Sequence, residues 1–559
     1  MSSRKKFPHR PPDDAVWYLA LGGAGEIGMN LSLYGTAGKW LMVDCGVTFG
    51  DDSAPGIDVV MPDIGFIAER RDDLAGLVVT HGHEDHIGAI EYLWPQLQCP
   101  VYATRFTAEL IRSKLGHADL KNKVRIIEVQ AGNPFEIGPF KSEMIPVTHS
   151  IPESYMLSVT TKHGTVLHTG DWKFDPDPVV GHVTDEARLK ELGRDGVMAL
   201  VGDSTNALVN GHSGSERDVQ NEFRRLFKTI KRRVVVTCFA SNIARVKSIA
   251  VAAKESGRYV TLVGRSLWRN AEVAEACGYL PEFSDFLTEN EAMLSPRDKI
   301  VMICTGCQGE MRSALARIAG ADHPEVELDP GDTVIFSSRD IPGNEKPIAR
   351  LQNNLVAQGL TIITQEHAPV HVSGHPAQEE LVELLQWTRP HLLLPVHGEA
   401  RHQMEHARVG KECQIPHTLI PANGQIIRLG PGIHEVVAEV PNGRLGLDGK
   451  MLRRMDHAVT KDRRKMSFNG AAVITIVMDG RGMVMQDPQV SLLGLTDEGQ
   501  GRDLIAAIAD AVLDGVENMP KSTRTDDAAV RHRAAQAARR FLQESHGKKP
   551  VMDVHVVRV

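Results

Sequence analysis

Short apolar runs that end in polar residues alternate with amphipathic stretches along most of the chain. Residues 74–80 form an apolar, β-branched run typical of a buried strand, and residues 87–93 have the pattern of a helix that begins directly afterwards. The same order returns at residues 234–239 and 243–256. This alternation predicts an α/β fold, in which functional side chains usually lie at the carboxyl ends of strands.

The segment between the first of these strands and its helix is His81-Gly82-His83-Glu84-Asp85-His86. It contains four potential metal ligands within six residues. Imidazole and carboxylate groups together suit zinc and its neighbours in the first transition series. A polar loop with three solvated histidines is the alternative, and we disfavour it because matching ligands recur downstream.

The downstream ligands are His149, Asp171 and His397, each of which follows a short apolar run. A single histidine or aspartate in such a position is usually structural, but an aspartate can also bridge two cations. Together with the six-residue loop, these residues predict a two-metal centre in which His397 completes the second set of ligands. Asp44, at the end of another predicted strand, is a candidate partner for a ligand histidine.

Two glycine-rich segments lie before this loop. Gly23-Ala24-Gly25-Glu26-Ile27-Gly28 has the glycine spacing of a dinucleotide-binding loop, but residues 29–34 alternate as a strand where such a site needs a helix. We therefore expect a tight turn that faces the metals. Residues 45–63 are rich in Gly, Pro and Asp, and we expect them either to line the site or to bind a structural cation.

The middle of the chain carries further buried strands that predict a second, parallel α/β unit inserted into the first. Ala240-Ser241-Asn242 lies between a strand and a helix amino terminus, which is a turn suited to an anion. Arg265 follows the next strand in the same position. Six basic residues nearby form either a local basic cluster or an ordinary solvated helix face: Arg224, Arg225, Lys228, Lys231, Arg232 and Arg233.

Shifts in pattern divide the chain into segments. We predict a flexible amino terminus at 1–15, a first domain at 16–210 and 359–442, an inserted domain at 211–358, a linker at 443–465 and a carboxyl-terminal domain at 466–559. The last domain is expected to contain a hairpin around 479–482 and two helices, near 500–516 and 525–544, and to serve in assembly or RNA contact.

Composition restricts the possible partners. The net charge of −8 repels nucleic acid overall, so an RNA substrate would require a locally basic groove.

Seven cysteines without framework spacing suggest a reducing compartment, and Cys304-Thr305-Gly306-Cys307 is expected to be a structural turn with buried thiols. No signal peptide or membrane span is recognisable, so we expect a cytoplasmic protein that does not contact membranes.

The combined motifs resemble the metallo-β-lactamase fold, and more narrowly the ribonuclease J family of its β-CASP subgroup. The resemblance is carried by the 81–86 loop with its downstream ligands and by four further motifs: Gly25-Glu26-Ile27-Gly28, Phe239-Ala240-Ser241-Asn242-Ile243, His371-Val372-Ser373-Gly374-His375 and Pro395-Val396-His397-Gly398-Glu399. The chain departs from the family pattern at Cys307, where a serine would be expected.

The resemblance implies an αββα sandwich with an inserted parallel α/β (β-CASP) domain and a small α+β carboxyl-terminal domain. It implies that His81, His83 and His149 hold one zinc ion, that Asp85, His86 and His397 hold a second, and that Asp171 bridges them, with Mn²⁺ or Mg²⁺ as alternatives. It further implies catalytic roles for Asp85, for His375 as general acid and for Asp203, which would orient either His375 or His397. The implied pocket for a substrate phosphate comprises Ala240, Ser241, Asn242, Arg265, His371, Val372, Ser373, Gly374 and His375.

The function implied by the resemblance is that of a zinc-dependent ribonuclease in RNA maturation and decay. It would act as a 5′-to-3′ exonuclease on single-stranded RNA with a 5′-monophosphate, with internal cleavage also available, and as a homodimer or homotetramer. One alternative is a hydrolase of the same fold that acts on a small ester or phosphodiester. Another is an inactive scaffold in an RNA-degrading complex, which would bind metal without hydrolysing RNA.

Overall fold

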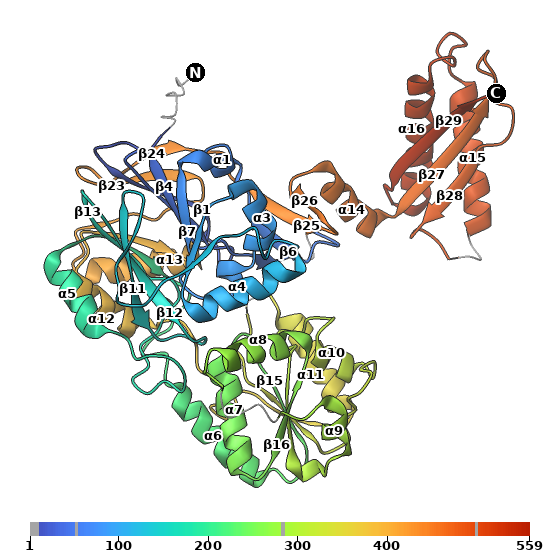
Figure 1. Ribbon diagram of the computed structural model, residues 1–559. Coiled ribbons are helices and arrows are strands. Elements are labelled where there is room, and N and C mark those ends of the chain that lie inside the picture. Colours follow the sequence, from blue (N-terminus) through green and yellow to red (C-terminus); the bar gives the residue numbers. More distant parts are fainter. Residues whose placement is uncertain (1–9, 51–53, 281–285, 342, 498–500) are drawn as a thin grey trace. The chain divides into compact units, whose positions relative to one another are not determined.

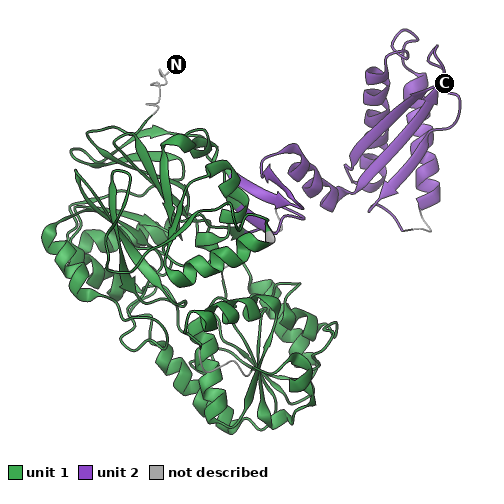
Figure 2. Ribbon diagram, in the orientation of Figure 1, with its two compact units in different colours: residues 1–48, 61–443 green, residues 49–60, 444–559 purple. Residues whose placement is uncertain are grey.

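The structure is a computed structural model that describes residues 10–50, 54–280, 286–341, 343–497 and 501–559 (Figure 1). The chain forms two compact units, one of residues 1–48 and 61–443, the other of residues 49–60 and 444–559 (Figure 2).

Part of the predicted flexible amino terminus is folded. Residues 1–9 lie outside the described residues, but the backbone carbonyl of Pro12 accepts a hydrogen bond from Ala37 N at 2.9 Å. Ala15 is buried, and its carbonyl accepts a hydrogen bond from Thr36 Oγ1 at 2.9 Å. Residues 12 and 15 therefore already pack against β3 and the turn that follows it.

Two β-sheets form the centre of the first unit. Their strand orders are β24-β23-β1-β3-β4-β7-β8-β9 and β10-β11-β12-β13-β14-β20-β22, and β2 and β21 form a short ribbon beside them. The strands are β1 (Val16–Gly22), β2 (Ala24–Gly25), β3 (Leu31–Thr36), β4 (Lys39–Val43), β7 (Leu74–Val78), β8 (Val101–Ala103), β9 (Ile126–Glu128), β10 (Phe135–Ile137), β11 (Phe140–Val147), β12 (Ser154–Thr161), β13 (Gly164–His168), β14 (Val197–Asp203), β20 (Leu392–Val396), β21 (Gly398–Glu399), β22 (His417–Thr418), β23 (Gln425–Gly430) and β24 (Glu435–Glu439). Apolar side chains of both sheets, among them Tyr18, Leu41, Leu157 and Leu394, form one shared core.

Helices accompany both sheets, and this explains why β1 and β20 are buried along their whole length instead of alternating. The helical segments are α1 (Gly65–Ala68), η1 (Arg71–Asp73), α2 (Glu84–Ile87), α3 (Ile90–Leu97), α4 (Arg105–His117), α5 (Glu186–Asp195), α12 (Gln378–Thr388) and α13 (Ala400–Glu412). Leu189 of α5 and Leu381 of α12 pack with Leu200 and Leu393 of the second sheet. The predicted αββα sandwich is confirmed.

Parallel neighbours bring several strand ends to one edge of the sandwich. In the second sheet β13, β14 and β20 are parallel, with Asp203 opposite Val396. In the first sheet β4 and β7 are parallel, with Val43 opposite Val78. Asp171, His397 and the 81–86 ligands follow β13, β20 and β7, and His149 follows β11, which has antiparallel neighbours but runs in the same direction as β13, so the topology gathers the predicted ligands.

The inserted domain lies between β14 and α12. Its five strands are all parallel in the order β16-β17-β15-β18-β19, which confirms the predicted parallel α/β insertion (Figure 1). Its elements are α6 (Glu216–Thr229), β15 (Val234–Thr237), α7 (Ile243–Glu255), β16 (Tyr259–Val263), α8 (Arg265–Ala276), α9 (Glu289–Leu294), η2 (Arg297–Lys299), β17 (Ile300–Cys304), α10 (Ala314–Ala319), β18 (Thr333–Phe336), α11 (Glu345–Ala357) and β19 (Thr361–Ile363).

The predicted basic cluster at the start of this domain is largely neutralised. Arg224 pairs with Glu255, and Arg225 pairs with Glu222. Arg233 is buried instead of facing solvent. These contacts favour an ordinary helix face and strand start over a basic groove for RNA.

The second unit contains the predicted linker in folded form. Its elements are β5 (Thr48–Phe49), β6 (Val59–Pro62), β25 (Arg444–Asp448), β26 (Met451–Arg454), α14 (Ala458–Asn469), β27 (Ala471–Met478), β28 (Gln489–Leu493), α15 (Gly501–Glu517), α16 (Asp527–His546) and β29 (Val551–Arg558). The prediction of a linker at 443–465 is wrong because β25 and β26 form an antiparallel hairpin around Gly449, which has a φ of 62°. This hairpin joins a four-stranded sheet with β6 and β5.

The carboxyl-terminal domain has the two predicted helices, α15 and α16, which pack on a sheet of order β28-β27-β29. The predicted hairpin around 479–482 forms, although it is short: Met478 makes an antiparallel bridge to Val484, and Met485 N donates to Val477 O at 2.9 Å. The longer antiparallel partner of β27 is β28. No helix in the described ranges is long and apolar enough to cross a membrane.

The start of segment 45–63 supports the site. Cys45 N donates to His86 O at 2.8 Å and Val47 N donates to Glu84 O at 3.0 Å, so its start braces the 81–86 loop. Within its described residues, no group of three potential ligands is close enough to hold an ion. Residues 51–53 lie outside the described residues.

Candidate metal centre

The 81–86 loop follows β7, its last three residues form the start of α2, and close backbone packing holds it in place. A side chain at Gly46 would place its Cβ only 1.6 Å from Asp85 O, so only glycine permits this approach. His81 and His86 are buried, whereas Asp85 and His83 are partly accessible. The loop thus presents its ligands toward the edge where β13, β14 and β20 end.

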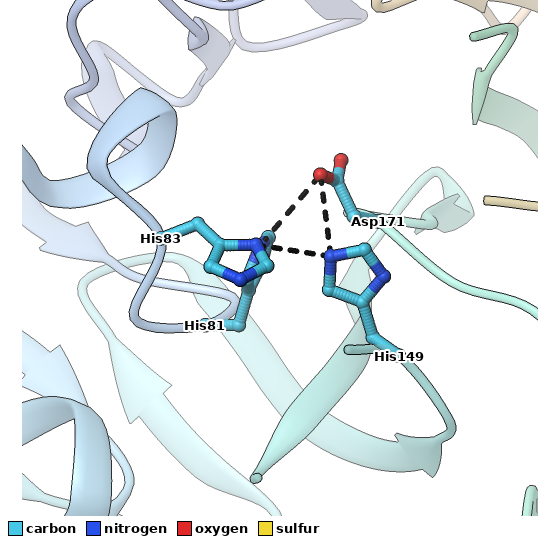
Figure 3. Close-up of side chains that lie close together, drawn as sticks. All are labelled: His81, His83, His149 and Asp171. Atoms are coloured by element: carbon cyan, nitrogen blue, oxygen red, sulfur yellow. Dashed lines mark hydrogen bonds and ion pairs between the residues drawn. The ribbon is translucent and has the colours of Figure 1, made fainter. Parts of the chain in front are cut away.

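The first group of side chains consists of His81, His83, His149 and Asp171 (Figure 3). His83 Nδ1 lies 3.1 Å from His81 Nε2 and 3.0 Å from His149 Nε2. Asp171 Oδ2 lies 3.7 Å from the Nε2 atoms of both His81 and His149. Three imidazoles and a carboxylate therefore face one another across a few ångströms.

The second group consists of Asp85, His86, Asp171 and His397. Asp171 Oδ1 lies 2.8 Å from His397 Nδ1 and 3.2 Å from His86 Nε2. His397 has a φ of 48°, and its N–H donates to Gly23 O at 2.6 Å. This strained backbone at the end of β20 turns the imidazole toward Asp171, and the Gly23 turn faces the same site.

Outer contacts orient several of these imidazoles. Asp44 Oδ2 lies 2.7 Å from His86 Nδ1, so the proposed partner of a ligand histidine is where the sequence suggested. Thr80 Oγ1 lies 2.9 Å from Asp44 Oδ2, and Gly374 O lies 2.5 Å from His149 Nδ1. Sequence reasoning missed Thr80 and Asn30, although both adjoin motifs that it selected. Asn30 Nδ2 lies 3.1 Å from His86 Nε2.

Burial disfavours a charge on the three imidazoles of the first group. Desolvation lowers the pKa values of His81 and His149, and it lowers the pKa of His83 to about 4. In the second group burial also opposes a charge on His397, but the carboxylates of Asp171 and Asp85 have the larger effect and raise the pKa of that imidazole. The neutral form of His81, His83 and His149 is the one in which histidine binds metal ions.

The donor set fits divalent first-row cations. Asp171 Oδ1 and both ring nitrogens of His397 are buried and make no hydrogen bond of ordinary geometry. Buried polar atoms without a hydrogen-bond partner destabilise a fold unless another group interacts with them. A cation among imidazole and carboxylate ligands is a partner that this set would satisfy.

His375 and Asp203 lie beside the second group. His375 Nδ1 is 2.8 Å from Asp203 Oδ2, and Asp203 Oδ1 is 3.6 Å from His397 Nδ1. Burial lowers the pKa of His375, but Asp203 and Asp171 more than compensate and raise it. The carboxylate thus fixes one ring nitrogen of His375 and favours its protonated form.

Part of the predicted phosphate pocket lies around the first turn of α7. Asn242 Oδ1 caps this helix by accepting from Arg245 N at 2.8 Å, while Ala240 and Ser241 are partly accessible. His371 Nδ1 lies 3.3 Å from Arg245 Nη1, and Val372 O lies 3.5 Å from Arg245 Nη2. Arg265 is exposed at the start of α8, outside the histidine–aspartate groups.

The segment before His375 is fixed by a residue that the sequence did not single out. Asn206 Nδ2 donates to Ser373 Oγ at 2.7 Å and to His375 O at 3.1 Å. Arg339 Nη1 of the inserted domain donates to Asn206 Oδ1 at 2.8 Å. Both domains of the first unit therefore hold the 371–375 segment in place.

Arg245 is a buried side chain that contacts several segments of the chain, and its charged partner is Glu216. The two side chains form two hydrogen bonds, of 2.7 and 2.9 Å, and Arg245 also donates to Ser337 O and lies near His371. Both residues are buried, so removal of one partner leaves the other charge without compensation.

We therefore expect Arg245→Met to lower the free energy of unfolding by about 3–5 kcal/mol, as measured by denaturant titration. The double variant Glu216→Gln/Arg245→Met removes both charges and should recover part of this loss. An equal loss in the single and double variants would show that lost packing, and not an unpaired carboxylate, is the cause.

Cys304 and Cys307 are free thiols and are buried, as expected for a structural turn. Burial raises the pKa values of both thiols, which disfavours the reactive thiolate. At position 307 the sulfur lies 3.8 Å from Gln308 Nε2 and outside the histidine–aspartate groups. The departure from serine therefore leaves the candidate metal ligands unchanged.

Comparisons with known families cover most of the chain. Models match four stretches: the beta-lactamase superfamily domain at 39–190, the ribonuclease J beta-CASP domain at 231–355, the Zn-dependent metallo-hydrolase RNA specificity domain at 364–419 and the ribonuclease J C-terminal domain at 458–559. A crystal structure of a protein of unknown function from Enterococcus faecalis V583 has a TM-score of 0.54 at 17% identity, covering 74% of this chain and 100% of that one. Fold and site together define a metallo-hydrolase of the metallo-β-lactamase fold.

Full-length relatives narrow this class. The chain is 43% identical to ribonuclease J of Sinorhizobium meliloti, with 100% of both chains covered. It is 34% identical to ribonuclease J of Thermus thermophilus, covering 97% of this chain and 95% of the relative. The chain belongs to the ribonuclease J family, and it is accordingly a metal-dependent hydrolase that acts on RNA.

Proposed function

We propose that the chain removes nucleotides from the 5′ end of single-stranded RNA and prefers ends that carry a monophosphate. The observation that carries this proposal is the position of the 371–375 segment. Its His375 touches Asp203 beside the candidate metal groups, and its His371 touches Arg245 in the first turn of α7. One short segment thus connects a candidate reaction centre to a candidate anion pocket.

We infer that two ions occupy the centre. His81, His83 and His149 would hold one, Asp85, His86 and His397 would hold the other, and Asp171 would contribute one oxygen to each. Zinc fits this set best, with Mn²⁺ or Mg²⁺ as alternatives. When bound, the cations would supply an activated water and would stabilise the charge of an in-line displacement.

The protein's own residues would position the RNA and move the proton. The hydroxyl of water adds to phosphorus, and the bond from phosphorus to the ribose 3′ oxygen breaks. His375, held at Nδ1 by Asp203, would donate a proton to that leaving oxygen. Asp85, 3.2 Å from His397 Nε2, lies at the partly accessible side and would orient the attacking water.

This direction of cleavage restores the preferred substrate end. Because the 3′ oxygen leaves, the phosphate remains on the shortened RNA as a new 5′-monophosphate. The turn at Ala240-Ser241-Asn242 would bind it through backbone N–H groups at the helix amino terminus. Local donors of this kind also allow RNA to bind although the net charge is −8.

We expect faster hydrolysis of 5′-monophosphorylated than of 5′-triphosphorylated RNA, measured with end-labelled oligonucleotides of one sequence. Ser241→Ala removes a hydroxyl at the amino end of α7 and should reduce this preference about tenfold, because a hydrogen bond to a charged group contributes about 1.5–3 kcal/mol. Ser256→Ala, at the carboxyl end of the same helix, is the matched control and should leave the preference unchanged. Equal rates on both RNA ends in the unmodified chain would refute the pocket.

A homodimer or homotetramer, a cytoplasmic location and internal cleavage of RNA are further parts of the proposal, and they rest on family resemblance. Hydrolysis of a small ester in preference to RNA would contradict the assigned substrate. Bound metal without any RNA hydrolysis would instead indicate a scaffold.

A further inference from the structure

Three histidines outside the catalytic groups meet at another place on the first unit. His391 directly precedes β20, His417 lies in β22 and His434 directly precedes β24. β22 is an edge strand of the seven-stranded sheet, and β24 is an edge strand of the eight-stranded sheet. The three side chains therefore connect the edges of the two sheets.

Their ring nitrogens lie close enough to share an ion. His391 Nδ1 is 3.0 Å from His434 Nε2, and one nitrogen from each residue can be chosen so that all lie within 4.8 Å of one another. The three ring centroids are separated by 4.9, 5.2 and 4.9 Å. Two nitrogens bound to one tetrahedral zinc ion at about 2.0–2.1 Å are roughly 3.3 Å apart, so small side-chain rotations would suffice.

Burial lowers the pKa of His434, and the neighbouring His417 and His391 lower it further. An uncharged imidazole offers the lone pair that a metal ion binds. His391 and His417 are exposed, so an ion could enter from solvent and keep a water ligand.

This cluster is separate from the catalytic centre. His391 and His397 flank opposite ends of β20 (Leu392–Val396), and at about 3.3 Å per residue they are roughly 20 Å apart. His397 belongs to the catalytic groups, whereas His391, His417 and His434 form a group of their own.

We propose that His391, His417 and His434 bind one divalent first-row transition-metal ion, such as zinc, nickel or copper, which clamps the edges of the two sheets together. Imidazole is a good ligand for all three ions, and affinity at such a site generally peaks at copper. An ion bound here would cross-link the segments around residues 391, 417 and 434, which belong to different strands of the two sheets.

The test is calorimetric titration of the metal-free, untagged full-length chain with zinc. His417→Ala should bind one equivalent fewer than the unmodified chain, and His391→Ala should repeat this loss. His532→Ala, at an exposed position of α16, is the matched control and should bind as many equivalents as the unmodified chain. Because the result is a difference, it does not depend on how many ions the catalytic centre holds.

Two further readouts test the clamp itself. Zinc should raise the thermal unfolding midpoint of the unmodified chain more than that of His417→Ala. Copper bound to the unmodified chain should give an electron paramagnetic resonance signal with nitrogen hyperfine structure that His417→Ala weakens. Equal zinc equivalents in His417→Ala and the unmodified chain would overturn the proposal and would leave the three imidazoles as a hydrogen-bonded surface cluster.

Discussion

Replacement of His83 by alanine should remove bound metal and RNA hydrolysis together. His83 Nδ1 lies 3.1 Å from His81 Nε2 and 3.0 Å from His149 Nε2, so it stands at the centre of the first group. Loss of one of three imidazoles leaves an ion with too few protein ligands. We expect zinc content, measured by elemental analysis, to fall by at least one equivalent and kcat/KM to fall by about 10³-fold or more, which corresponds to roughly 4 kcal/mol.

The matched control is His163→Ala, a histidine on the same domain whose ring lies 2.8 Å from the backbone carbonyl of Asp13, outside the candidate metal groups. It should retain both zinc and activity. A chelator should inactivate the unmodified chain, and added zinc should restore it. Full activity of His83→Ala with unchanged zinc content would remove this residue from the metal centre.

The fold and the seven candidate ligands could be predicted from the sequence because they depend on two things. These are the local order of apolar and polar residues, and the tendency of α/β sheets to place functional side chains at the carboxyl ends of strands. The 81–86 loop carries its ligands within six residues. Asp171 and His397 could be added because parallel strands deliver their carboxyl ends to one edge, and His149 could be added because it also follows a strand, although β11 has antiparallel neighbours. The register of β14 against β20 then places Asp203 opposite Val396, next to His397.

The contacts that the sequence could not supply join segments far apart in the chain. Gly374 O against His149 joins the two sequence parts of the sandwich domain, and Glu216 against Arg245 joins helices α6 and α7 of the inserted domain. The linker prediction failed for a related reason. Polar residues at 443–465 resemble a loop, yet the segment pairs with β6, about 390 residues earlier, and no local pattern reveals such a partner.

Replacement of His375 by alanine should leave metal in place and abolish most of the turnover. If His375 donates the proton to the leaving oxygen, its loss should lower kcat by about 10²–10⁴-fold, with KM nearly unchanged because the pocket at Ala240-Ser241-Asn242 is intact. Asp203→Asn keeps a hydrogen-bonding side chain at 2.8 Å but loses the negative charge, so its effect on kcat should be smaller. Single-turnover cleavage of end-labelled RNA separates this chemical step from product release.

Imidazole added to the solution should partly restore turnover in His375→Ala, because its protonated form can replace the lost proton donor. It should have no effect on His83→Ala, because one free imidazole does not rebuild the set of protein ligands. The competing role for His375 is metal binding, since its ring nitrogen also lies close to Asp171, Asp203 and His397. Zinc analysis distinguishes the two roles. A lost equivalent in His375→Ala, without rescue by imidazole, would make it a ligand, and the proton for the 3′ oxygen would then have to come from another group.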